Sequence, residues 1–118
     1  MFSKDIRARM SQSQEKWLTE VLGGIPQPGS GNQPARPLDG RMDHHRSPVA
    51  FAWDAKSTLA DSITLTKLMW QKVIEQSHGE RPLLPIRFYH SDRLTSHLDL
   101  AVISMHDLLE LLEYVPTR

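Results

Sequence analysis

The sequence predicts a mixed α/β domain with a central mixed β-sheet flanked by helices, and three observations favour this fold class. Three stretches have helical periodicity, short apolar stretches of strand type lie between them, and clusters of Gly and Pro separate the elements. A chain of 118 residues is long enough for one hydrophobic core but too short for two domains. We therefore expect a single domain over residues 11–118, preceded by a flexible basic segment at 1–10.

The first half of the domain is predicted to contain one helix and one β-hairpin. The helix begins with a capping-box sequence at 11–14 and ends at the Gly-Gly pair of residues 23–24. Residues 25–37 are rich in Pro, Gly, Ser, Asn and Gln, which indicates a long loop. Residues 38–56 are expected to form the hairpin around a polar turn at 44–48.

The second half is predicted to contain two helices with two strands between them. Residues 62–79 carry apolar side chains at helical spacing and end on a glycine. Residues 83–89 and 98–105 are of strand type, and 106–115 are expected to form a closing helix. The predicted order of elements is α, β, β, α, β, β, α.

The second strand of the hairpin is apolar on one face and charged near its end on the other. Because strand side chains alternate between faces, Phe51 and Trp53 share the side that is expected to face the core. Asp54 and Lys56 share the opposite side, two residues apart. One interpretation is a surface ion pair worth less than about 1 kcal/mol. The other is a functional site.

A second carboxylate on the first strand of the hairpin favours the functional interpretation. Asp39 lies fifteen residues before Asp54, so the hairpin could bring the two carboxylates together. Close carboxylates repel each other and are stable chiefly with a cation between them, and Mg²⁺ takes oxygen ligands. Lys56 beside such an ion could orient an attacking water or stabilise charge on a phosphate. Glu15, on the edge of the first helix's apolar stripe, could border the same cleft.

These residues and their order resemble the PD-(D/E)xK nuclease superfamily. More specifically, five stretches are similar to the small Holliday junction resolvases of archaeal type and their phage relatives. They are GSGN at 29–32, LDGR at 38–41, FAWDAKST at 51–58, MWQKVIEQS at 69–77 and LLPIRF at 83–88. The resemblance covers residues 11–113 and implies a restriction-endonuclease-like core that acts as a homodimer on four-way DNA junctions with Mg²⁺ or Mn²⁺.

The resemblance also implies the roles of individual residues in a metal site. Asp39 and Asp54 would be metal ligands, together with the carbonyl of Ala55. Lys56 would be the catalytic lysine, and Glu15 would complete the metal site from the first helix.

Further polar residues are expected to contact DNA. Ser30 matches a serine of a Gly-Ser-Gly loop near the scissile phosphate, and Asn32 and Arg41 follow it in the same half of the chain. Ser57 and Thr58 could contact the DNA backbone, although Ser and Thr after a strand are more often turn or cap residues.

Two questions stay open at this level. Asp43, eleven residues before Asp54, is a rival to Asp39 as the first carboxylate, because no proline directly precedes Asp39. The function could also be that of a DNA-binding module of nuclease fold without activity, or of a nicking or repair nuclease acting on linear duplex.

Composition restricts the remaining possibilities. The chain has no cysteine, so a metal must be held by oxygen or imidazole, and 14 basic residues balance 14 acidic ones. No apolar stretch is long enough to cross a membrane. We expect a cytoplasmic protein, in the host cytoplasm if the chain is phage-encoded.

Overall fold

A computed structural model describes residues 4–26, 40–42 and 50–113, with 24–26 and 40–42 described by their backbone. This part of the chain forms a mixed α/β fold of three helices and a six-stranded sheet, which confirms the predicted fold class at that level. The helices are α1 (Lys4–Leu22), α2 (Lys67–Gln76) and α3 (Met105–Leu112). The strands are β1 (Gly24–Pro26), β2 (Gly40–Met42), β3 (Phe51–Trp53), β4 (Lys56–Thr58), β5 (Arg81–Tyr89) and β6 (His97–Val102).

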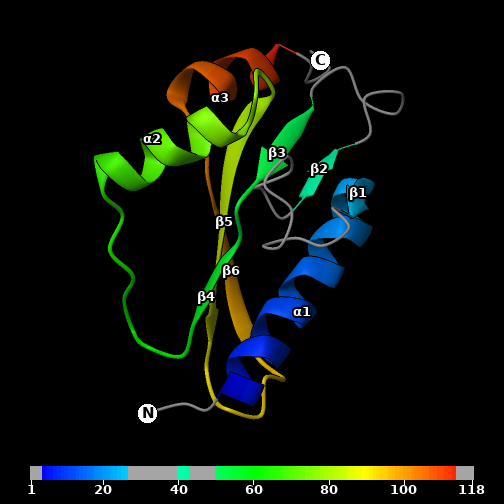
Figure 1. Cartoon of the computed structure of the whole chain (residues 1–118), viewed down its shortest axis with the longest axis vertical. Helices are drawn as coiled ribbons and strands as arrows, with labels where there is room; N and C mark the ends of the chain where they lie inside the picture. Colours follow the sequence, from blue (N-terminus) through cyan, green and yellow to red (C-terminus); the bar gives the residue numbers. More distant parts are fainter. Residues whose placement is uncertain (1–3, 27–39, 43–49, 114–118) are drawn as a thin grey trace.

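The sheet is mixed, with β5 at its centre. β1, β2 and β3 pair in antiparallel order, which confirms the predicted hairpin between β2 and β3. β3 and β4 both pair with β5 in parallel, and β6 pairs with β5 in antiparallel orientation. Figure 1 shows α1 on one side of this sheet and α2 on the other.

Each side of the sheet has its own apolar core, because successive residues of β5 point to opposite faces. Leu83 belongs to the core under α1, and its neighbour Leu84 belongs to the core under α2. The α1 side buries Leu18, Phe51, Trp53 and Leu83. The α2 side buries Val73, Leu84 and Ile86. The prediction that Phe51 and Trp53 face a core is confirmed.

The predicted start of the first helix is wrong. The helix begins at Lys4, and residues 4–10 of the segment that we expected to be flexible form its first turns. Met10, Gln14 and Leu18 are buried at a spacing of four residues, so the stripe facing the sheet begins before the supposed capping box. The predicted end is confirmed, since Gly23 follows the helix with a φ of 62°, in the left-handed region.

Two other boundaries differ from the prediction. β1 is a strand at the start of a stretch predicted to be a loop, because its backbone pairs with β2. α2 begins at Lys67 instead of residue 62, because Thr66 caps it and its Oγ1 accepts a hydrogen bond from the Met69 amide at 3.0 Å. The bounds of β5, β6 and α3 lie within three residues of those predicted.

Candidate functional site

The candidate site lies where the strand formed by β3 and β4 is interrupted. Asp54 and Ala55 separate the two short strands, yet the register along β5 does not change across the interruption. Trp53 lies opposite Leu83, and Lys56 lies opposite Ile86. No residue is inserted, so the interruption is a local loss of hydrogen bonds and not a bulge.

Proline in β5 explains the loss of these bonds. Continuing the register places Ala55 opposite Pro85, and in a parallel ladder the Pro85 nitrogen would donate to the Asp54 carbonyl. Proline has no N–H, so this bond does not form. The Asp54 amide still donates to the Leu83 carbonyl at 3.2 Å, which holds the chain in line. The backbone around Asp54 is therefore positioned by β5 without being fully paired to it.

Asp54 and Lys56 form an ion pair on the α2 side of the sheet. Lys56 Nζ lies 3.3 Å from Asp54 Oδ2, and the two side chains are 39% and 27% exposed. The alternation predicted from the sequence is confirmed, because Phe51 and Trp53 pack under α1 while the charged pair opens toward α2. A pair this exposed contributes little to stability, so it leaves both charges available to a ligand.

The pair opens onto a cavity of about 320 Å³ whose opposite wall is α2. Besides Asp54 and Lys56, the residues that line it are Thr66, Leu68, Met69, Lys72 and Gln76. The lining is mainly polar on the strand side, and the helix adds one ammonium, one amide and one hydroxyl group. A cavity with these groups suits a small anion such as a phosphate group of a larger ligand.

The amino-terminal end of α2 forms part of this wall. Thr66, Leu68 and Met69 line the cavity. The Thr66 hydroxyl accepts a hydrogen bond from the Met69 amide. The first N–H groups of a helix have no partner within it and carry a partial positive charge, which favours anions nearby. α2 has ten residues, so the aligned peptide dipoles of a complete helix contribute to the partial positive charge at this end.

Lys72 and Gln76 are further residues of the site, and α2 supplies both. They lie four residues apart on α2 and both line the cavity, and Lys72 is at the same time exposed to solvent. Lys72 forms no ion pair with any residue in the described ranges. The sequence signal for this pair is their i, i+4 spacing, which puts both residues on one side of the helix that follows the Asp54 strand. With Asp54 and Lys56 compensating each other, Lys72 leaves the cavity net positive.

Gln14 supports the site from the other face of the sheet. Its side chain is buried, and Nε2 donates to the Lys56 carbonyl at 3.0 Å and lies 3.5 Å from the Pro85 carbonyl. Sequence reasoning assigned Gln14 to a helix cap and missed this contact. Its position midway between Met10 and Leu18 on one helical stripe was the signal that it is buried.

The other predicted residues of this region occupy different places. The Thr58 hydroxyl accepts a hydrogen bond from the Ala60 amide at 3.0 Å, which fits a turn residue. Ser57 follows Lys56 in β4, is half-buried and does not line the cavity. Glu15 is half-buried on α1 and does not line it either, and its metal role stays a prediction. Ala55 packs against the core under α1.

Several predicted site residues lie outside the described ranges. They are Ser30, Asn32, Asp39 and the rival carboxylate Asp43. Arg41 is described by its backbone, which lies in β2 opposite Ala52. Within the described ranges, no three Asp, Glu or His side chains form a group that could hold a metal ion.

Comparisons with known proteins add no family. No protein-family model matches the chain, and no curated protein matches it. Among the described residues, no helix is long and apolar enough to cross a membrane.

Proposed function

We propose that the chain is a Mg²⁺- or Mn²⁺-dependent endonuclease of the PD-(D/E)xK type that hydrolyses phosphodiester bonds in four-way or other branched DNA. The observation that carries the proposal is the ion pair of Asp54 and Lys56 at an interrupted strand, facing a cavity that also contains Lys72. The mixed sheet flanked by helices supports a restriction-endonuclease-like core.

In this proposal, the cavity binds the scissile phosphate through its positive groups. Lys72 and the amino-terminal end of α2 attract the phosphate oxygens, and Lys56 lies on the facing wall with its ammonium group held by Asp54. When phosphate enters, Lys56 exchanges part of its contact with Asp54 for a contact with the phosphate. Lys56 then stabilises the negative charge that develops on the phosphate oxygens during hydrolysis.

The donor set suits a hard metal ion. Asp54, the Ala55 carbonyl, Asp39 and Glu15 offer only oxygen ligands, which Mg²⁺ and Mn²⁺ prefer, and the chain has no cysteine. When bound, such an ion supplies a water of lowered pKa and neutralises charge on the leaving oxygen. Gln14 holds the backbone at Lys56 in place through its hydrogen bond to the Lys56 carbonyl. Pro85 has no N–H, so the backbone at Asp54 stays incompletely paired.

The register of β2 favours Asp39 over Asp43 as the first carboxylate. Gly40, to which Asp39 is joined, lies opposite Trp53, the residue before Asp54. Met42, to which Asp43 is joined, is at the end of β2 that runs away from Asp54. Residues opposite each other on antiparallel strands are about 5 Å apart, so the Gly40 end is the one within reach of Asp54.

The second candidate function is that of a DNA-binding module without activity. Only one carboxylate lines the cavity in the described part of the chain, and it is already neutralised by Lys56. A site with two lysines and a paired acid binds phosphate without any metal. Cleavage distinguishes the two functions.

The test is cleavage of four-way junction, nicked, flap and linear duplex DNA by the purified chain, with Mg²⁺, with Mn²⁺ or with EDTA. We expect metal-dependent cleavage, fastest on the junction, and a fall of at least about a hundredfold in Asp54→Asn and in Lys56→Met. Asp61→Asn and Lys67→Met are matched controls, because both residues are exposed and outside the cavity lining.

Each alternative has its own outcome. Faster cleavage of linear duplex than of the junction would favour a nicking or repair nuclease. DNA binding without cleavage of any substrate in either metal would contradict the endonuclease and support the binding module.

A further inference from the structure

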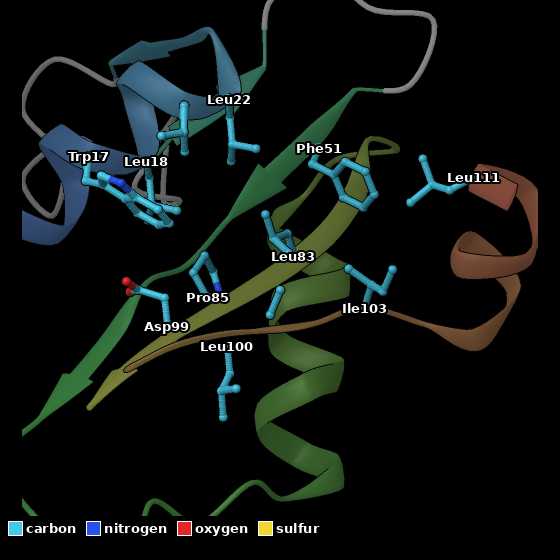
Figure 2. Close-up of a pocket in the computed structure, with 12 residues that line it drawn as sticks. Trp17, Leu18, Leu22, Phe51, Leu83, Pro85, Asp99, Leu100, Ile103 and Leu111 are labelled. Carbon is cyan, nitrogen blue, oxygen red and sulfur yellow. The ribbon is translucent and has the colours of Figure 1, made fainter. Parts of the chain in front are cut away.

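Two cavities of similar volume lie on opposite sides of the sheet and differ in the chemistry of their lining. The cavity on the α1 side, of about 320 Å³, is apolar, and Figure 2 shows Trp17 and Leu111 on opposite sides of it. Within the described ranges, Asp99 is the one charged residue of that lining, and it already pairs with Arg87. The Asp54 cavity, also of about 320 Å³, combines charged, amide and aliphatic groups. Its ligand is therefore expected to have both a charged and an apolar part.

Three residues of one ridge of α2 form the helix wall of the Asp54 cavity. Leu68, Lys72 and Gln76 follow each other at i, i+4 and i+8, and all three line the cavity. Successive members are about 6 Å apart along the helix axis, because each residue rises about 1.5 Å. The wall thus presents an aliphatic, a cationic and an amide group in order along its length. A phosphate bound at Lys72 has Leu68 beside it on the amino-terminal side.

Packing of the domain does not account for the apolar side chain of Leu68. The residue is 61% exposed, whereas Val73 of the same helix is 1% exposed. Met69 and Trp70 pack with Val73 against the core under α2, and Leu68 is not part of that core. At about 100° per residue, Leu68 points about 140° away from Val73 around the helix axis. Leu68 is therefore available to contact a ligand that enters the cavity.

The part of DNA that an aliphatic side chain beside a phosphate can contact is the face of a base. DNA-binding proteins insert Leu, Ile, Met or Phe side chains between successive bases in this way. In a continuous duplex the contact costs free energy, because the base must first be separated from its neighbour. The cost is lowest where the base is already unpaired or unstacked. A leucine at this place therefore distinguishes DNA by its local stacking and not by its sequence.

We propose that Leu68 packs against the base next to the phosphate bound at Lys72, and that the cavity thereby prefers DNA with an interrupted base stack. The inference rests on the proposed function, because it takes DNA as the ligand, but it requires neither metal nor cleavage. It also differs from recognition of a four-way geometry, since a bulge of unpaired nucleotides interrupts the base stack as well. A bulged duplex is thus a sufficient probe.

The first test compares the binding of a bulged duplex and of the fully paired duplex of the same sequence, in EDTA, by fluorescence anisotropy. We expect the wild-type chain to bind the bulged duplex at least about tenfold more tightly, and Leu68→Ser to reduce this preference to less than about threefold, because serine lacks the aliphatic contact. Leu68→Met should retain the preference, since methionine side chains also insert between bases. Ile74→Ser is the matched control, because Ile74 is 46% exposed on α2 but lies outside the cavity lining.

Two further measurements separate a base contact from a general loss of binding. Leu68→Ser should leave the slope of log affinity against log salt unchanged, because the substitution removes no phosphate contact. With 2-aminopurine placed beside the bulge, binding of the wild-type chain should raise the fluorescence as this base unstacks. Binding of Leu68→Ser should not raise it.

The outcomes separate this inference from the proposed function. Metal-dependent cleavage together with a bulge preference that Leu68→Ser leaves intact would overturn the inference and leave the proposed function in place. A bulge preference that depends on Leu68, without cleavage of any DNA, would support the inference for a binding module. Equal binding of the bulged and paired duplexes by the wild-type chain, or binding of neither, would also overturn the inference.

Discussion

Two ion pairs on opposite sides of the sheet have similar chemistry but differ in how completely they are enclosed. On the α1 side, Arg87 contacts both oxygens of Asp99, with Nε at 2.6 Å from Oδ1 and one terminal nitrogen at 3.2 Å from Oδ2. On the α2 side, Lys56 and Asp54 share a single contact of 3.3 Å.

Arg87 makes further contacts besides its ion pair with Asp99. Its guanidinium lies 5.0 Å from the centre of the Trp17 ring and 5.5 Å from that of Tyr89, and it also donates to the Tyr89 hydroxyl. Burial alone lowers the pKa of Arg87, but the hydrogen bonds to Asp99 and Tyr89 outweigh it and leave the pKa above its usual value. Only 1% of the residue is exposed.

This difference in burial determines which of the two pairs can exchange a contact for one with a ligand. Arg87 has no free side and no route to a ligand, so its pair joins α1, β5 and β6. Lys56 and Asp54 are partly hydrated and open to a cavity, so a phosphate can replace one contact at little cost. Burial, and not the presence of opposite charges, therefore distinguishes the structural pair from the candidate functional pair.

The largest expected effect is on the enclosed pair. Arg87→Met should lower the free energy of unfolding by about 3 kcal/mol, because it removes the cation that contacts both oxygens of the partly buried Asp99 and leaves this carboxylate with its His97 Nδ1 contact at 2.8 Å. Urea denaturation followed by circular dichroism measures the change. Arg93→Met is the control, since Arg93 is exposed in the turn between β5 and β6, and it should change stability by less than about 0.5 kcal/mol. Equal effects would contradict the comparison.

A smaller effect is expected on ligand binding at the open pair's cavity. Lys72→Met should weaken DNA binding about fivefold to tenfold and reduce the slope of log affinity against log salt by about 0.9, because one phosphate contact is lost. Fluorescence anisotropy in EDTA at several salt concentrations measures both. Lys67→Met, on the same helix but outside the cavity lining, should leave the slope unchanged. A slope that falls equally in both variants would mean that the cavity does not receive the phosphate.

The smallest effect should be the coupling within the open pair itself. A double-mutant cycle of Asp54→Asn and Lys56→Met should give an interaction energy in unfolding of less than about 1 kcal/mol. The same two changes are the ones expected to abolish cleavage. A coupling of about 3 kcal/mol or more would show that Asp54 and Lys56 form a structural contact, as Arg87 and Asp99 do.

The parts of the site that follow from local pattern could be predicted from the sequence. Strand alternation placed Phe51 and Trp53 toward a core and Asp54 and Lys56 away from it, and the structure confirms this. The hairpin between β2 and β3 and the glycine end of α1 follow from equally local signals. These features depend on residues close together in the chain.

The parts that depend on distant residues could not be predicted in this way. Gln14 reads as a cap residue until β4 is placed beside α1, where its amide meets the Lys56 carbonyl. Lys72 is an exposed residue, and its place on the cavity wall depends on how α2 lies over the strand. The inward acids of α3 depend on Arg81, twenty-six residues before Asp107. In each case the role of a polar residue depends on a contact with a distant part of the chain.

Pro85 gives the molecule a dependence that a motif search would not detect. It has no charge and does not line the Asp54 cavity, yet its missing N–H is what leaves the strand interrupted at Asp54. A substitution such as Pro85→Ala would add a backbone donor and could close the ladder, so a mutation that strengthens the sheet would alter the site.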